Sequence, residues 1–411
     1  MVLLTSMSGL ISNALTILSG LIVARWLMPE QLGLFNSFSI IISYIILLQL
    51  GIPSGLSRNF PYYIGQNNRP HAEQLAATAA YWSLALGFII LALSMVTSIG
   101  FMVAGNYKFA AGVFVIGISS FQSFFVTKYL KILFRSNNDF NKLATINIIN
   151  AVISFASIVF VKYFDFYGLC IRAIFLCLSD FVLTWWMRPA KIQPHWEKDH
   201  FRSLLKVGMP IYWVANVYSL WPIVQRTIVV FIGGTKALGL LGLALMVETG
   251  MNIISTSISS VVFPKMSNAW GKSHRFSELL QIAWKPVAVG FSVNSILVIV
   301  GWLALPLFVN FLLPNFVEGI QAAQWSLLVG LISIFSVFSN IYMVVQQNLS
   351  RLVSYVTGFV VWLVSLFIFY SVRGFNLINF PQSMCIAYVS IYLVDFYFMR
   401  KFSKKFKQVQ S

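Results

Sequence analysis

Few ionisable side chains interrupt the apolar stretches of this sequence, and those few could do chemistry. A charge inside an apolar helix is costly, so such a residue usually faces a cavity, pairs with an opposite charge or takes part in transport. An arginine suits a phosphate or diphosphate because its planar fork can donate two hydrogen bonds at once. The residues in question are Arg172, Asp180, Arg226, Glu248 and Asp395.

Arg226 and Glu248 are expected at similar depth on consecutive helices. Two interpretations stay open for them. The pair can be a structural salt bridge that joins the two helices. Alternatively, Arg226 faces a central cavity and attracts a diphosphate, and Glu248 orients the guanidinium.

Arg172 and Asp180 lie eight residues apart on one predicted helix. That spacing corresponds to about 12 Å at 1.5 Å per residue. They are too far apart to pair, so each needs another partner. Arg172 is either structural or part of the cavity. Asp180 is the strongest candidate for ion coupling in the first half of the chain, as Glu248 is in the second.

The elements that must position these residues are membrane-spanning helices. The chain has 411 residues, of which 58% are hydrophobic and 9% charged, and its mean hydropathy is +0.81. A soluble protein carries about 25% charged residues, and stretches of roughly 20 apolar residues cross a bilayer as helices. We therefore expect an all-α polytopic membrane protein with twelve helices. They are predicted at 2–24, 34–57, 75–99, 109–130, 143–163, 166–187, 209–232, 240–263, 282–305, 321–343, 352–372 and 378–399.

Lysine and arginine concentrate in alternate connections between these helices. The positive-inside rule places those connections in the cytoplasm, so both termini are expected there. The net charge of +17 then reflects topology and attraction to anionic inner-leaflet lipid. Nucleic-acid binding is not needed to explain it.

The longest polar connection, 188–208, divides the chain into two expected six-helix lobes around a central cavity. The N-terminal lobe is 1–187, the C-terminal lobe is 209–399, and a basic cytoplasmic tail follows at 400–411. Phe60-Pro61 and Phe263-Pro264 close the second helix of each half. Repeated halves are common in secondary transporters, whose substrate site lies between them.

The segment 21–70 carries a pattern shared by bacterial polysaccharide flippases. A helix ends in Ala24-Arg25, a Leu-x-Pro-Glu-x-x-Gly turn follows, and a second helix ends in a Gly-rich stretch and Arg58. The chain thus resembles the O-antigen-type flippases of the multidrug/oligosaccharidyl-lipid/polysaccharide exporter superfamily. The resemblance encourages a role for Arg58 in capturing diphosphate at the inner mouth and for Arg25 at an outer gate.

The resemblance implies a flippase in the bacterial cell inner membrane. Its substrate would be an undecaprenyl-diphosphate-linked oligosaccharide destined for O-antigen (lipopolysaccharide), capsule or exopolysaccharide. Expected partners are this glycan lipid, membrane lipids and a polysaccharide polymerase with its chain-length machinery. Polar residues that could line a sugar cavity, or instead form helix-to-helix hydrogen bonds, are Asn13, Ser43, Gln49, Asn216, Gln225, Asn252 and Asn294.

A cation-coupled multidrug exporter of the same fold is the main alternative. A membrane glycosyltransferase or polymerase is disfavoured, because the predicted outer connections are short and show no nucleophile–base pair. A major-facilitator transporter is disfavoured because the connection after the second helix lacks that fold's acidic-then-basic signature. The cysteines lie inside predicted spans and the histidines in loops, so no metal or cofactor is expected.

Overall fold

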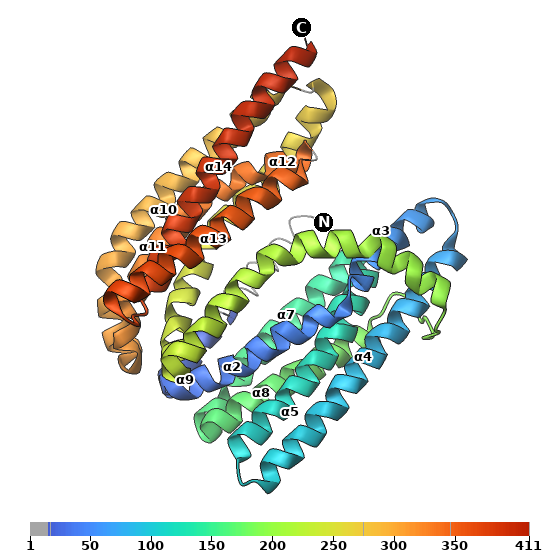
Figure 1. Ribbon diagram of the computed structural model, residues 1–411. Coiled ribbons are helices and arrows are strands. Elements are labelled where there is room, and N and C mark those ends of the chain that lie inside the picture. Colours follow the sequence, from blue (N-terminus) through green and yellow to red (C-terminus); the bar gives the residue numbers. More distant parts are fainter. Residues whose placement is uncertain (1–14, 17, 274, 346, 411) are drawn as a thin grey trace. The chain divides into compact units, whose positions relative to one another are not determined.

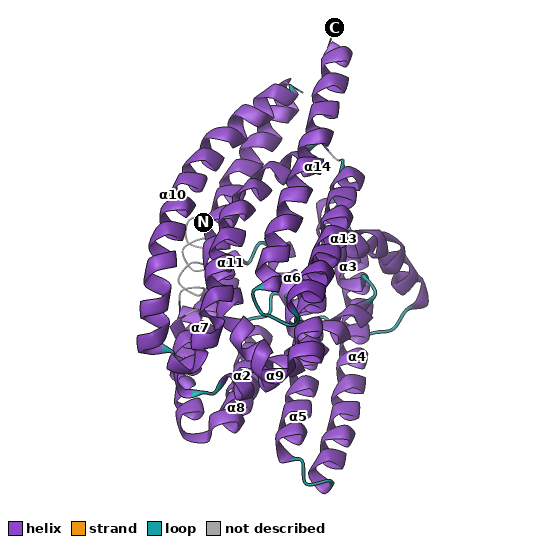
Figure 2. Cartoon of the chain, turned by 60° about the vertical axis from the view of Figure 1, so that its left-hand side comes forward, coloured by secondary structure: helices purple, strands orange, loops and turns teal. Residues whose placement is uncertain are grey.

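The structure is a computed structural model that describes residues 15–16, 18–273, 275–345 and 347–410. The part of the chain so described contains helices and connecting loops but no strand (Figure 2). Within it, nine helices are long and apolar enough to cross a membrane, and Phe140–Ala156 is a shorter apolar helix. The expectation of an all-α polytopic membrane protein is therefore confirmed. Most of the first predicted helix, 2–24, and Asn13 lie outside the described residues.

Two of the long helices contain a single non-helical residue at a predicted connection. In α8 (Ile158–Trp186) this residue is Asp165, with φ 48°. In α9 (Lys198–Ser273) it is Gly234, with φ 75°. The connections expected at 163–166 and 232–240 thus each coincide with one backbone break. Gly234 supplies the positive φ without steric cost because it lacks a Cβ.

The chain divides into two units, and residues 1–230 form the first. Figure 1 shows α4, α5 and α8 side by side, and their contacts agree. The element η2 is a π-helical stretch that continues α5. Besides α8 and the start of α9, the unit contains α2 (Pro29–Ile45), η1 (Ile46–Gln49), α3 (Ile52–Gly65), α4 (Arg69–Val103), α5 (Tyr107–Gln122), η2 (Ser123–Leu130), α6 (Lys131–Ser136) and α7 (Phe140–Ala156).

Residues 231–411 form the second unit. In it α14 packs against α11 and α13, and α10 packs against α11 (Figure 1). Besides the end of α9, this unit contains α10 (Phe276–Leu312), η3 (Pro314–Gly319), α11 (Ile320–Ser333), η4 (Ile334–Ser339), α12 (Asn340–Val344), α13 (Asn348–Arg373) and α14 (Asn379–Gln410).

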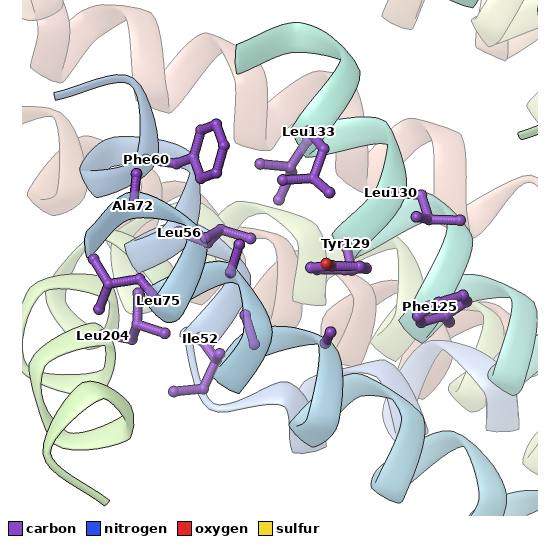
Figure 3. Packing of buried hydrophobic residues seen from close by; sticks show 14 of the residues in the cluster. Ile52, Leu56, Phe60, Ala72, Leu75, Phe125, Tyr129, Leu130, Leu133 and Leu204 are labelled. Carbon is purple, nitrogen blue, oxygen red and sulfur yellow. The ribbon is translucent and has the colours of Figure 1, made fainter. Parts of the chain in front are cut away.

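The main core of the first unit joins α3, α4, η2 and α6. Leu56, Leu75 and Leu133 are fully buried in it, and Phe60 and Tyr129 are almost so. Figure 3 shows these side chains converging from separate helices. Burial of each large apolar side chain contributes about 1.5–3 kcal/mol relative to exposure in water. In a bilayer the gain comes instead from close packing.

The stretch 209–230 belongs to the first unit by its contacts, whereas the sequence places it in the C-terminal lobe. The Tyr212 hydroxyl donates a 2.8 Å hydrogen bond to the Leu47 carbonyl. A 3.1 Å hydrogen bond joins the hydroxyls of Tyr44 and Thr227. The division into two six-helix lobes remains a prediction.

Candidate functional site

Arg226 lies on the part of α9 that belongs to the first unit, and its side chain is half-buried. The residue before it, Gln225, is buried. The residue after it, Thr227, bonds to Tyr44 of α2, so α2 passes close to the arginine. Arg226 therefore sits in a partly polar environment within a membrane-spanning helix, where a guanidinium can bind an anion.

Glu248 is half-buried on the same continuous helix, beyond the break at Gly234. It belongs to the second unit, whereas Arg226 belongs to the first. The pairing of these two side chains therefore remains a prediction.

Arg172 bonds to two serines. Its Nη2 donates to the Ser154 hydroxyl at 2.9 Å, to the Ser154 carbonyl at 3.3 Å and to the Ser19 hydroxyl. These bonds tie α8 to α7 and to the helix that precedes α2. This geometry favours the structural interpretation of Arg172, because its Nη2 bonds to groups of the same unit.

Asp180 is the centre of a buried polar network on α8. Lys131 Nζ lies 2.9 Å from its Oδ2, and Gln122 Nε2 donates to the same oxygen at 2.6 Å. Asn150 Nδ2 donates to Oδ1 at 2.7 Å, and the Ser179 hydroxyl donates to Asn150 Oδ1 at 3.0 Å. The carboxylate thus receives three donors from three other helical segments. A buried charge paired and bonded in this way holds helices together, and leaves little room for a transported cation.

The π-helical stretch η2 explains how Gln122 and Lys131 meet at one carboxylate. They are nine residues apart, which in an ideal α-helix places side chains on opposite faces. The i→i+5 bonds of a π-helix put more residues into each turn. Because Ser123–Leu130 is π-helical, the side chains of Gln122 and Lys131 lie on the same face of the helix and both reach Asp180.

The remaining predicted arginines lie apart from this network. Arg25 is exposed just before α2, and Arg58 is exposed on α3. The 17-residue helix α2 separates them, which is about 25 Å of helix. Arg25 therefore precedes α2 and Arg58 follows it in the chain, and their outer and inner roles remain predictions.

Of the polar residues that could either line a cavity or bond between helices, several form hydrogen bonds within or between helices. Ser43 donates to the Ser39 carbonyl at 2.8 Å, and Asn216 donates to the Tyr212 carbonyl at 2.8 Å. Asn252 accepts from the Ser333 hydroxyl at 2.5 Å. Asn294 donates to the Gly330 carbonyl at 3.4 Å.

Asp395 on α14 is one of the charges noted inside the apolar stretches, but the sequence assigned no role to it; its side chain is buried, with 3% exposed. The Ser339 hydroxyl donates to its Oδ2 at 3.3 Å. Asp395 also lines a hollow of about 1010 Å³ between α10, η4 and α14, together with Glu278, Lys285 and several aromatic side chains. The hollow lies wholly within the second unit.

A sequence signal for Asp395 exists. Leu178-Ser179-Asp180-Phe181 and Leu393-Val394-Asp395-Phe396 share the pattern Leu-x-Asp-Phe. At the same offset, Cys170-Ile171 matches Cys385-Ile386. Asp395 is therefore the counterpart of Asp180 in an internal repeat.

Comparisons with known proteins show the family and, separately, the fold. The family model described as polysaccharide biosynthesis protein matches residues 22–313. A search of curated proteins found no match.

Three solved structures share the architecture over nearly the whole chain. An inward-facing multidrug resistance MATE family transporter of the MOP superfamily is 14% identical, with a TM-score of 0.75, covering 97% of this chain and 96% of that one. An outward-facing MATE transporter is 18% identical, with a TM-score of 0.67 and coverage of 99% and 96%. A MOP superfamily transporter from Pyrococcus furiosus, whose binding pocket has reversed polarity, is 14% identical, with a TM-score of 0.65 and coverage of 98% and 96%. At such identities the likeness shows the fold alone.

Proposed function

This chain belongs to the polysaccharide biosynthesis protein family, and we propose that it is a flippase for lipid-linked oligosaccharides. Its substrate is an undecaprenyl-diphosphate-linked repeat unit, moved from the inner to the outer leaflet of the bacterial inner membrane. The product feeds the assembly of O-antigen, capsule or exopolysaccharide by a polymerase.

The family match, in a chain with many membrane-spanning helices, is the observation that carries this proposal. Sugar hydroxyls and a diphosphate cannot cross the hydrocarbon core unaided, because unpaired polar groups there are costly. The transporter fold supports a route through the protein. A pathway for polysaccharide synthesis needs such a step wherever the repeat unit is made on one leaflet and polymerised on the other.

Arginines supply the anion recognition in this proposal. Arg226 binds the diphosphate during transport, and Glu248 sets its orientation. Arg58 captures the lipid at the inner mouth, and Arg25 acts at the outer end. The serine contacts of Arg172 favour a structural role for it, and the three donors around Asp180 disfavour ion coupling there.

The test uses purified protein in liposomes that contain undecaprenyl-diphosphate-linked oligosaccharide. A membrane-impermeant enzyme that modifies the sugar reports how fast the substrate becomes accessible. We expect acceleration over protein-free liposomes, and less acceleration with Arg226→Ala. Absence of acceleration with several sugars and with an imposed ion gradient would contradict the flippase proposal.

A cation-coupled multidrug exporter is the second candidate. The hollow in the second unit favours it, because Glu278, Asp395 and aromatic rings such as Trp284 and Phe396 line it together. Carboxylates and aromatic faces both attract organic cations. Gradient-driven efflux of a fluorescent aromatic cation from the same liposomes, without glycolipid transport, would support this candidate.

A further inference from the structure

The first unit contains a second hollow that the proposed transport path does not use. It has a volume of about 470 Å³ and lies between α4, α5 with η2, α8 and the connection 190–194. It is bounded at one end by the point where α8 ends, at Trp186. In a membrane-spanning helix that end lies at the level of the lipid headgroups.

A ladder of aromatic rings forms the wall of this hollow. Phe88 lies 5.1 Å from Phe121, and Phe121 lies 6.1 Å from Phe181, between ring centroids. The rings of Phe181 and Trp185 are stacked at 6.0 Å with an angle of 13°. Phe125 adds a ring 5.9 Å from Trp185. Because Phe88 and Trp185 are 57% and 43% exposed, the ladder is open to a chain from the bilayer.

The guanidinium of Arg188 lies at the Trp185 end of the ladder. The Arg188 Cζ lies 3.7 Å from the centroid of the Trp185 ring, and its Nη1 donates to the Trp185 carbonyl at 2.9 Å. These two contacts fix the guanidinium and leave donors for another acceptor. Lys191 also lines the hollow, and no carboxylate does.

The surface next to this hollow adds no net negative charge. An adjoining hollow shares Lys191 and contains Arg69 and Glu73. Glu73 pairs with Arg69 at 2.9 Å, so its charge is already compensated. Arg188 and Lys191 thus remain as an uncompensated pair of cations beside an aromatic groove.

We propose that this groove binds an anionic phospholipid of the leaflet that faces the connection 188–208. The phosphate binds Arg188 and Lys191, and one acyl chain lies along the ladder from Trp185 toward Phe88. Basic pockets between membrane helices bind lipid headgroups by this chemistry. The hollow of the second unit has two carboxylates, Glu278 and Asp395, beside one lysine, Lys285, in its lining, so it suits an anionic headgroup less well.

Photocrosslinking tests the proposal with the full chain in phosphatidylcholine vesicles that contain a phosphatidylglycerol probe with a diazirine in one acyl chain. Mass spectrometry then locates the labelled residues. We expect label on residues 84–130 and 181–194, and weak label there from the matching phosphatidylcholine probe. Removing each cation should lower specific labelling roughly fivefold, so Arg188→Gln with Lys191→Gln should nearly abolish it.

Two further variants control the experiment. Arg400→Gln removes a guanidinium that lies 4.5 Å from the Phe396 ring at the other hollow, and it should leave the labelling unchanged. Phe88→Ala, at an exposed position, should shift the label away from the far end of the ladder. Equal labelling by the two probes, or undiminished labelling of the double variant, would overturn the proposal. Displacement of the probe by undecaprenyl phosphate at equal concentration would overturn it too, by assigning the groove to the transported lipid.

Discussion

Asp180 is the buried acid with the most complete set of partners in the described part of the first unit. Lys131, Gln122 and Asn150 all donate to its carboxylate. Asp180→Asn removes the charge of the carboxylate. It also replaces one of the two accepting oxygens with an NH₂ group, which then faces a donor of Lys131, Gln122 or Asn150. Breaking a buried ion pair costs 3–5 kcal/mol. Because Lys131 is 18% exposed and can reach water, we expect a loss of about 2–3 kcal/mol, measured as thermal unfolding in detergent.

Asp395→Asn is the matched control, because it changes the same residue of the same Leu-x-Asp-Phe repeat. The Ser339 hydroxyl bonds to its carboxylate, and a hydroxyl can donate or accept. We expect a loss below about 1 kcal/mol. Equal losses in the two variants would contradict the role assigned to Lys131.

Arg226 is tested by comparing two substitutions. Arg226→Lys keeps a point charge but loses the planar fork, and Arg226→Ala loses both. A charge-assisted hydrogen bond contributes about 1.5–3 kcal/mol, so we expect Arg226→Ala to slow glycolipid transport by at least about tenfold. Arg226→Lys should lie between this variant and the original protein. Near-normal transport by both variants would remove Arg226 from the mechanism.

At the scale of elements, a contact between glycines joins α3 to the start of α9. A Cβ on Gly208 would lie 2.0 Å from the Gly51 carbonyl oxygen. Since that neighbour is backbone, it cannot move aside cheaply, and overpacking of this kind costs about 1–3 kcal/mol. Gly208→Ala should lower the unfolding temperature in detergent. Gly65→Ala, whose Cβ would meet nothing within 4 Å, should leave it nearly unchanged, and a similar fall in both would refute the contact.

The helices and two of their breaks could be predicted because both follow from local sequence. Long charge-free intervals predict membrane spans, and the expected connections coincide with Asp165 and Gly234. The network around Asp180 could not be predicted in the same way. It depends on a π-helical stretch that changes which face Lys131 occupies, and a residue pattern read at 3.6 residues per turn hides that change.

The site residues were predictable by type rather than by role. Isolated charges in apolar stretches mark Arg172 and Asp180 as needing partners, and both have them. Which partners they take depends on contacts between helices far apart in sequence. Asp395 was noted as a charge in an apolar stretch but received no role, although the Leu-x-Asp-Phe pattern that it shares with Asp180 points to one.

At the scale of the whole molecule, the two units differ in the partners of their buried aspartate and in the charges that line their hollow. The first carries a buried aspartate on α8 and the second carries one on α14, and each has an open hollow beside that helix. The first unit pairs its aspartate with a lysine and surrounds its hollow with cations. The second gives its aspartate a serine partner, and two carboxylates and one lysine line its hollow. The two hollows therefore differ in the charges that line them.

The orientation of the molecule decides which leaflet supplies the substrate. The connection after α8 carries many cations, among them Arg188 and Lys191, whereas the connection between α4 and α5 is followed only by Lys108. The positive-inside rule then places the former in the cytoplasm and the latter outside.

Asn106→Cys and Gln193→Cys probe these two exposed positions. In intact cells a membrane-impermeant thiol reagent should label only the first, and after permeabilisation it should label both. The parent protein serves as the control for Cys170, Cys177 and Cys385, none of which is exposed. The reverse pattern would place Arg58 and the basic groove at the outer leaflet, where an inward-to-outward flippase has no substrate to capture.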